Sequence, residues 1–315
     1  MINDENGENW LQELSTGIEK LCFQGLKYDL KDLEFVAKNC KHLISVKIDA
    51  KYDYIDLVGF FSYAVNLVEF AGGKFINQHK DEYKSFMFPE SVKQLSISCT
   101  IDAKFILPFA HLITKLYCSS VYKASDFQLI KSCRNLKVLH LPNDIKDQEL
   151  QDITIYCKNL RTLIVISPKV SHNGVIHIAK HCVELECLHI GAINMTNRVM
   201  RFIGKNMRKL KDFELYLWQK KNVPALDNGV RSLLIRCDKL EMLSIFSQLD
   251  GGWLTDKGLG FIGKYGCNLR YLFLGNINVK ESDAGVMELS KLGYRCVCLH
   301  DYNNKEAINI YDRRI

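Results

Sequence analysis

The sequence has 315 residues, of which 47% are hydrophobic and 25% charged, and its formal net charge is +6. This composition is typical of a globular protein and supplies enough apolar surface for a large core. No segment approaches 18 uncharged apolar residues, so we expect no transmembrane helix and no membrane partner. Lys and Arg are spread along the chain, which argues against the basic stripe of a nucleic-acid-binding protein.

The first 17 residues are polar and acidic, without the basic region and apolar run of a secretory signal. The chain also contains twelve cysteines. Since no secretory signal precedes them, we expect these cysteines to be reduced thiols rather than disulfides. The sequence therefore predicts a location in the nucleus or the cytoplasm.

The pattern apolar-x-x-apolar-x-apolar recurs along nearly the whole chain. Successive copies are 21 to 30 residues apart, which is within or just beyond the spacing of leucine-rich repeats. A weaker last copy is Tyr294–Val297–Leu299. The first positions of the clear copies are Ile18, Leu43, Leu67, Val92, Ile113, Leu136, Leu160, Leu185, Leu210, Leu240 and Leu269.

Each repeat predicts one short strand and one helix. The last two apolar positions of the pattern alternate with polar residues, as in a strand with one buried face. Helical stretches follow, as in 173–180 and 198–205. One strand and one helix cannot enclose a core, but stacked copies can. The residues that we expect to cap these helices are Ser171, Thr196, Asp227 and Thr255.

The predicted fold is an α/β leucine-rich-repeat solenoid. We expect a curved horseshoe with parallel strands on the concave face and helices on the convex face, because helices are wider than strands. The predicted organisation is a polar N-terminal segment at 1–17, a solenoid of about eleven to twelve repeats at 18–299, and a C-terminal tail at 300–315.

Several cysteines occupy one repeated position, three residues before the first apolar residue of a repeat. A metal ladder or a redox array is one interpretation. We favour a small buried side chain at the end of each helix, because metal ligands must converge whereas equivalent solenoid positions run in parallel. These cysteines are Cys40, Cys133, Cys157, Cys182 and Cys237, with Cys267 as a near match.

Two motifs suggest chemistry that we do not expect here. The glycines of Gly258–Gly263 match G-x-G-x-x-G, but they fall inside a predicted helix rather than at a phosphate-binding turn. His177 and His181 are one helical turn apart, but a third ligand is not evident, so we expect solvent-facing or capping histidines. We identify no catalytic residue, no metal site and no cofactor, so the chain is not expected to be an enzyme.

A binding surface is predicted where aromatic residues alternate with the buried leucines of the last repeats. Stacking should make Tyr216 a lateral neighbour of Phe246, and Met242 a neighbour of Tyr271. We expect a protein or peptide to bind there. The loops 217–225 and 247–253 would lie along one edge, while an exposed strand face without a partner remains the alternative. The predicted patch consists of Glu214, Tyr216, Met242, Phe246, Gln248, Tyr271 and Phe273.

Three segments resemble one protein family. They are Leu226–Leu240, Gly251–Tyr265 and the shorter Asp56–Phe61, and they resemble the coronatine-insensitive proteins, the plant F-box receptors of jasmonate. The resemblance extends from about Asn9 to Leu292. It implies an origin in the substrate-recognition subunit of an SCF ubiquitin ligase. Family members bind jasmonoyl-isoleucine and a repressor peptide on the concave side, above an inositol phosphate.

The sequence departs from this family where the ligands need positive charge. A carboxylate and a polyphosphate require charge-assisted donors. We therefore predict no appreciable binding of jasmonate and no inositol phosphate cofactor. Where the family has basic residues, this chain has Pro142-Asn143, Gln248-Leu249-Asp250, and Glu90 and Gln94 after Phe88-Pro89.

The family's F-box precedes its repeats, and here the repeats begin by Ile18, so we expect no F-box in this sequence. SCF components would then be partners only through an upstream F-box. Two alternatives to a recognition module remain open: a free-standing repeat scaffold and an incomplete, non-functional gene product.

Overall fold

The chain folds as two compact units of leucine-rich repeats, one up to Leu136 and the other from Lys137. This computed structural model describes residues 17–23, 25–49, 51–74, 82–99, 103–118, 124–218, 225–248, 252–277, 284–290, 296–300 and 307–311.

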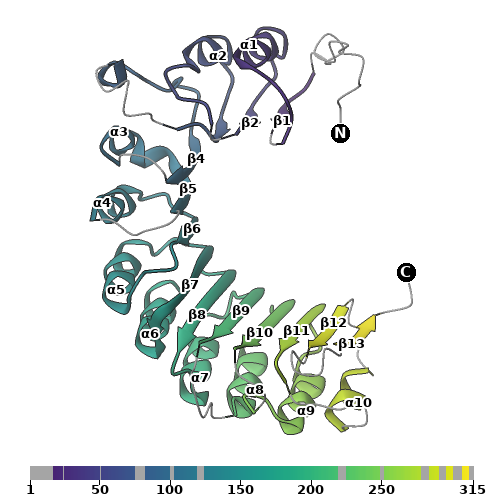
Figure 1. Ribbon diagram of the computed structural model, residues 1–315. Coiled ribbons are helices and arrows are strands. Elements are labelled where there is room, and N and C mark those ends of the chain that lie inside the picture. Colours follow the sequence, from purple (N-terminus) through teal and green to yellow (C-terminus); the bar gives the residue numbers. More distant parts are fainter. Residues whose placement is uncertain are drawn as a thin grey trace. The chain divides into compact units, whose positions relative to one another are not determined.

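The first unit is a parallel sheet whose strands pair in sequence order (Figure 1). Its strands are β1 (Lys20–Cys22), β2 (Ser45–Lys47), β3 (Glu69–Ala71), β4 (Gln94–Cys99) and β5 (Ile113–Cys118). Its helices are α1 (Leu30–Asn39), α2 (Val58–Tyr63), η3 (Glu82–Lys84), α3 (Ala103–Ile106), η4 (Leu107–Leu112) and α4 (Ala124–Ser132).

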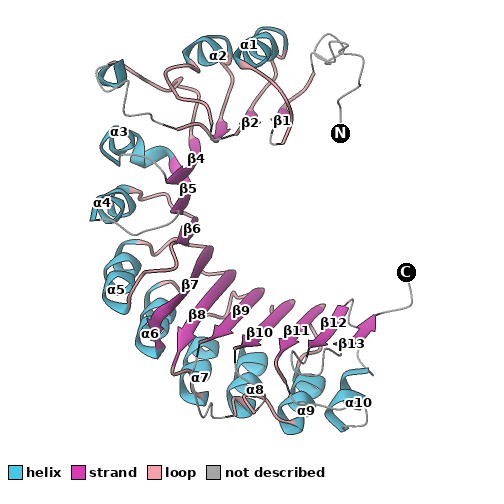
Figure 2. Ribbon diagram, viewed as in Figure 1, coloured by secondary structure: helices cyan, strands magenta, loops and turns pink. Residues whose placement is uncertain are grey.

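The second unit is a longer sheet with helices along one side (Figure 2). Strands β6 to β12 are parallel, and β13 pairs antiparallel with β12 inside the segment 300–315 that was predicted as a tail. The strands are β6 (Val138–Leu141), β7 (Thr162–Ser171), β8 (Cys187–Ile193), β9 (Asp212–Leu217), β10 (Met242–Ser247), β11 (Tyr271–Gly275), β12 (Cys296–His300) and β13 (Ala307–Tyr311). The helices are α5 (Asp147–Tyr156), α6 (His172–His181), α7 (Asn197–Asn206), α8 (Asp227–Arg236), α9 (Asp256–Tyr265) and α10 (Ala284–Ser290).

The cores of the two units differ in their side chains. In the second unit the repeat leucines fill the space between sheet and helices, and Leu188, Leu215 and Leu243 are completely buried. In the first unit aromatic rings pack against one another, as Phe86 does edge-on against Phe88 with centroids 5.0 Å apart. Aromatic and aliphatic residues thus serve the same repeat pattern, because each position requires only a buried apolar side chain.

Side chains at the first helical position connect successive repeats of the second unit. Asp227 begins α8 and accepts hydrogen bonds from the backbone N–H (3.0 Å) and Oγ1 (2.7 Å) of Thr255, the residue that caps the next helix. Asp147 of α5 accepts the same pair of bonds from Ser171. Asn197 of α7 accepts from the backbone N–H of Gly229 at 2.5 Å.

These bonds revise the predicted caps. Ser171 and Thr196 are N-caps whose side chains accept backbone N–H groups, as expected. Asp227 is not an N-cap, because Leu226 occupies that position. Thr255 is the N-cap of α9, but its hydroxyl donates to Asp227 and makes no capping bond within its own helix. At Thr255, contact with the neighbouring repeat has replaced local capping.

The repeated cysteines lie where the sequence predicted. All five are buried, and Cys40, Cys157, Cys182 and Cys237 are the C-caps of their helices. The thiol of Cys182 lies 3.7 Å from the carbonyl oxygen of Cys157, and the thiol of Cys237 lies 3.5 Å from that of Met207. The prediction that Cys267 occupies a similar position is wrong, because Gly266 is the C-cap of α9 and Cys267 is exposed.

Candidate functional site: the strand face of the second unit

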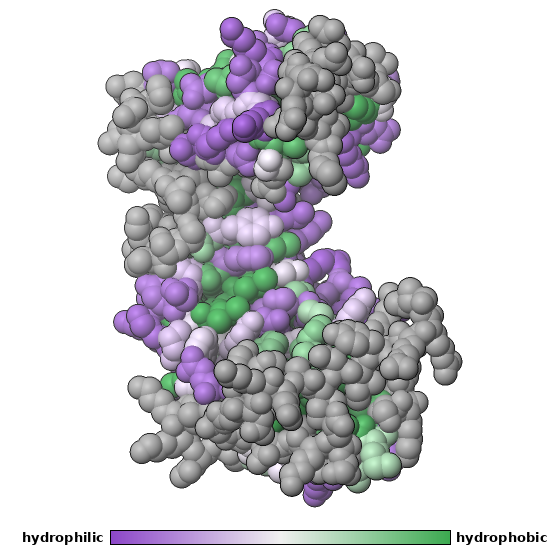
Figure 3. Space-filling model, turned by 45° about the vertical axis from the view of Figure 1, so that its right-hand side comes forward, coloured by the Kyte–Doolittle hydropathy of each residue, from purple (hydrophilic) through white to green (hydrophobic). Residues whose placement is uncertain are grey.

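The strand face of the second unit presents the side chains that alternate with the buried core residues. In β9, for example, Phe213, Leu215 and Leu217 are buried, while Asp212, Glu214 and Tyr216 are half-buried on the other face. Figure 3 shows hydrophobic residues exposed among hydrophilic ones on the surface of the chain. The predicted patch lies on this face, over β9, β10 and β11.

The structure brings the central aromatic residues together as the repeat spacing predicted. Tyr216 is laterally paired with Phe246, and their rings stack with centroids 5.3 Å apart and planes at 24°. Tyr216 also stacks on Trp218 at 6.3 Å. Glycines flank the pair: Gly191 is opposite Tyr216, and Gly275 is opposite Phe246. These three aromatic residues, with the two glycines, form the aromatic row.

Steric crowding explains why Gly191 and Gly275 are glycines in the aromatic row. A Cβ atom at Gly275 would lie 2.7 Å from Cδ1 of Phe246, and one at Gly191 would overlap the indole of Trp218. Neither position could carry a side chain without moving a ring. The glycines therefore allow the rings to lie against the backbone of the neighbouring strands.

The other predicted patch residues are close to the aromatic row. Met242 is paired with Tyr271, and Phe273 lies two residues further along β11, opposite Ser244. All three are half-buried, and Gln248 after β10 is exposed. Ser244, which alternates with the buried Leu243 and Ile245, is nevertheless only 2% exposed, because its lateral neighbours Glu214 and Phe273 are larger. The loops 217–225 and 247–253 are only partly described, since 219–224 and 249–251 lie outside the described residues.

A polar cluster adjoins the aromatic row on β8 and β9. Nε2 of His189 lies 3.0 Å from Oδ2 of Asp212, and its Nδ1 lies 3.8 Å from Oε1 of Glu214. The hydrogen bond to Asp212, followed by that to Cys187, raises the pKa of His189 to about 10. Burial, and then the charge of His189, lowers the pKa of His140 on β6. We call Cys187, His189, Asp212 and Glu214 the polar cluster.

Sequence reasoning placed Glu214 in the predicted patch but did not single out Cys187 and His189. These two residues occupy alternate positions of β8, so their side chains lie on the same face of the sheet. Cys187 pairs laterally with Asp212. The sequence did contain a signal for this cluster. Cys-x-His in a predicted strand places both side chains on one face, and the 25-residue offset between the repeats at Leu185 and Leu210 places Asp212 beside Cys187.

The two motifs that were set aside fall on helices. Gly258, Gly260 and Gly263 lie within α9, as predicted. His177 and His181 stack on α6 with ring centroids 5.9 Å apart. Both are half-buried rather than fully solvent-facing, because they lie against each other on the helix surface.

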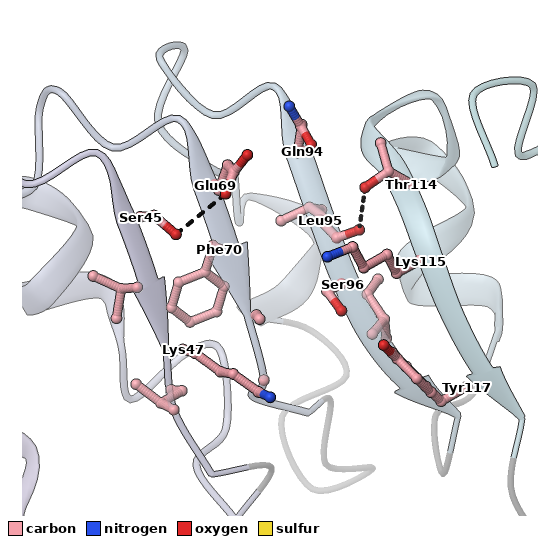
Figure 4. A pocket seen from close by; sticks show the side chains of 15 residues that line it. Ser45, Lys47, Glu69, Phe70, Gln94, Leu95, Ser96, Thr114, Lys115 and Tyr117 are labelled. Atoms are coloured by element: carbon pink, nitrogen blue, oxygen red, sulfur yellow. Dashed lines mark hydrogen bonds between the residues drawn. The ribbon is translucent and has the colours of Figure 1, made fainter. Parts of the chain in front are cut away.

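The first unit has a separate, shallow pocket of about 500 Å³ on its own strand face (Figure 4). Strands β2 to β5 supply its lining. Lys47 and Lys115 project from the sheet there, and Oγ of Ser45 donates a hydrogen bond to Glu69 at 3.2 Å. The pocket thus mixes both signs of charge.

No helix in the part of the chain that the structure describes has the length and hydrophobicity of a transmembrane segment.

Comparison with known proteins identifies relatives by sequence and by fold. No protein-family profile matches the chain. It is 36% identical to coronatine-insensitive protein 1 of Arabidopsis thaliana, over 91% of this chain and 52% of that protein. It is 35% identical to coronatine-insensitive protein homolog 1b of Oryza sativa subsp. japonica, over 96% of this chain and 55% of that protein. The chain thus spans about half the length of the curated relatives it matches.

Solved structures add a likeness of fold. A chain of the yeast Rad7–Elc1 complex superposes with a TM-score of 0.61 at 16% identity, covering 89% of this chain and 75% of that chain. At this level of identity the similarity concerns the leucine-rich-repeat architecture alone.

Proposed function

Starting from the chain's homology to the coronatine-insensitive proteins over more than nine-tenths of its length, we propose that it is a substrate-recognition module of the ubiquitin-ligase type. The strand face of its second unit would bind a protein or peptide. Leucine-rich-repeat proteins are typically non-catalytic binding proteins, and we propose no reaction for this chain. Nucleus or cytoplasm is the proposed location.

The single observation that carries this proposal is the aromatic row. Aromatic side chains that are half-exposed and already stacked lose little conformational freedom on binding, so they make effective anchors. The strands beneath them are rigid, because each is paired on both sides.

The polar cluster favours a particular partner chemistry. Asp212 and Glu214 with a protonated His189 leave one net negative charge beside the aromatic row. A peptide with an apolar side chain next to a lysine or arginine would complement this arrangement. A small carboxylate ligand would instead meet two carboxylates, which supports the expectation that jasmonoyl-isoleucine does not bind well.

The test measures binding of synthetic repressor peptides, of the kind that this receptor family recognises, by fluorescence anisotropy. Tyr216→Ala and Phe246→Ala should each weaken binding about tenfold or more, as truncation of a central aromatic anchor usually does. Tyr156→Ala is the matched control, since Tyr156 is an exposed aromatic residue on α5 and not on the strand face. Equal affinity of all three variants and the original chain would contradict the proposed site.

Co-purification separates the remaining alternatives. Recovery of the full-length protein with the adaptor subunit of an SCF ligase would support a role in ubiquitin transfer. A well-folded chain that binds repressor peptides but no adaptor would be a free-standing scaffold. Aggregation without binding would favour a non-functional gene product.

A further inference from the structure

Three residues of the polar cluster offer three different metal-ligating atoms at one point of the strand face. Sγ of Cys187, a ring nitrogen of His189 and a carboxylate oxygen of Asp212 all lie within 4.8 Å of one another. Two of them come from alternate positions of β8, and the third comes from the paired position of β9. A parallel sheet holds such atoms in place, because lateral pairing fixes the spacing between the strands.

The two distances from Asp212 are close to those between the ligands of a tetrahedral zinc ion, and the third, between Cys187 and His189, is at most 4.8 Å. Zinc binds sulfur at about 2.3 Å and nitrogen or oxygen at about 2.0–2.2 Å, so its ligand atoms are roughly 3.3–3.7 Å apart. In the cluster, Oδ2 of Asp212 lies 3.0 Å from Nε2 of His189 and 3.5 Å from Sγ of Cys187. Small side-chain rotations would suffice to admit an ion.

The surroundings of His189 and Asp212 add independent support. A histidine that binds a metal through one ring nitrogen usually directs the other towards a carboxylate, and Nδ1 of His189 faces Glu214 in this way. Oδ1 of Asp212 is buried and has no hydrogen-bond partner among the described residues. A buried carboxylate oxygen without a donor is a costly arrangement, and a cation at the neighbouring Oδ2 would stabilise the charge of the same carboxylate.

We propose that Cys187, His189 and Asp212 form a binding site for a divalent transition-metal ion of the zinc class, with Glu214 orienting His189 from the second coordination sphere. Thiolate and imidazole ligands select zinc-like ions over Mg²⁺ and Ca²⁺, which prefer oxygen. Three protein ligands leave a fourth coordination position for water or for a side chain of the partner.

The bound cation would leave the net charge of the polar cluster unchanged. Asp212, which holds a proton on His189 in the metal-free chain, would coordinate the ion instead. The two positive charges of the ion would offset the two carboxylates, and the thiolate of Cys187 would carry the one negative charge that remains beside the aromatic row.

The experiment titrates the full chain, purified under reducing and metal-free conditions, with Co²⁺ as a spectroscopic substitute for Zn²⁺. One equivalent of Co²⁺ should bind and produce the near-ultraviolet charge-transfer absorption of a cobalt–thiolate bond. Cys187→Ser should remove this absorption, whereas Cys267→Ser, which changes an exposed thiol of the same unit, should retain it. Asp212→Asn and Glu214→Gln should each weaken binding, Glu214→Gln by about 10- to 100-fold.

A second measurement needs no variant and so does not depend on the folding of one. Zn²⁺ should slow the alkylation of Cys187 in the unchanged chain, mapped by mass spectrometry, and should leave Cys267 unaffected. The absence of a charge-transfer band, a band that survives in Cys187→Ser, or alkylation of Cys187 that is indifferent to Zn²⁺ would each overturn the proposal.

Discussion

The buried thiols show how a single repeated residue serves a repeated structural position. A cysteine at the end of a helix is small enough for the tight corner, and its thiol can donate weakly to a carbonyl oxygen of the preceding repeat, as Cys182 does. Burial raises the pKa values of Cys157, Cys182 and Cys237 to about 12. These thiols therefore remain protonated and unreactive in the folded chain.

This environment predicts both reactivity and pH dependence. Iodoacetamide should modify the exposed Cys22 and Cys267 in the native chain and reach Cys157 and Cys182 only after unfolding. Thiols of the unfolded chain ionise above a pKa of about 8.5, whereas the buried thiols keep their protons. Their contribution to stability is thus complete below that pH and is lost as the pH rises towards 12.

The pH dependence can be measured by urea unfolding at a series of alkaline pH values. The free energy of unfolding should decline less steeply with pH in the double variant Cys157→Ala/Cys182→Ala than in the original chain. Identical slopes would show that these thiols do not ionise differently in the two states.

At the scale of the helix and strand, each element depends on the next repeat for hydrogen bonds that it does not make itself. The carboxylate of Asp227 satisfies the backbone N–H and the hydroxyl of Thr255 in the following repeat. Asp147 occupies the same helical position and accepts the same pair of bonds from Ser171, while Asn197 accepts the backbone N–H of Gly229 in the first turn of α8. Hydrogen bonds therefore link the N-terminal ends of successive helices in the second unit.

Asp227→Ala should lower the free energy of unfolding by about 2 kcal/mol, because it leaves a partly buried backbone donor without its partner. Asp227→Asn should lower the free energy of unfolding by less, since Asn197 already accepts a backbone N–H at the equivalent position of α7. Asp238→Ala, at an exposed aspartate after the same helix, is the control. Thermal and urea unfolding monitored by circular dichroism would measure all three. If Asp227→Ala lowers the free energy of unfolding no more than Asp238→Ala does, then Asp227 does not stabilise the contact between α8 and the next repeat.

At the scale of the whole molecule, the net charge of +6 does not describe the charge of the proposed binding surface. The strand face of the second unit carries Asp212 and Glu214 beside its aromatic row, while the pocket of the first unit contains Lys47, Lys115 and Glu69. Charge is thus unevenly distributed over the strand faces. Binding at the proposed site would depend on this local distribution of charge rather than on the net charge.

This distribution predicts the response to the ligands of the homologous receptors. Addition of jasmonoyl-isoleucine should leave the melting temperature of the chain unchanged, because a ligand that binds the folded state raises it and a weakly bound one does not. Differential scanning fluorimetry over a range of ligand concentrations would measure this. Coronatine-insensitive protein 1 provides the positive control, and a clear, concentration-dependent shift for this chain would contradict the prediction.

Much of the fold was predictable from local pattern. The apolar positions of each repeat identified the strands, and their alternation identified which face each side chain occupies. The stacking of Tyr216 on Phe246 followed from repeat spacing alone, because parallel pairing places equivalent positions side by side. Interactions between different repeat positions were harder to foresee, and the role of Asp227 was missed for this reason.

The sequence by itself determined the repeat architecture, the buried positions of the cysteines and the location of the aromatic row. Each of these depends on a period that can be read along the chain. Only the tertiary structure decided the distances between the ligand atoms of Cys187, His189 and Asp212, that Ser244 is covered, and that the repeats form two compact units. The physical reason is that these features depend on distances and side-chain sizes across neighbouring strands, which no single repeat contains.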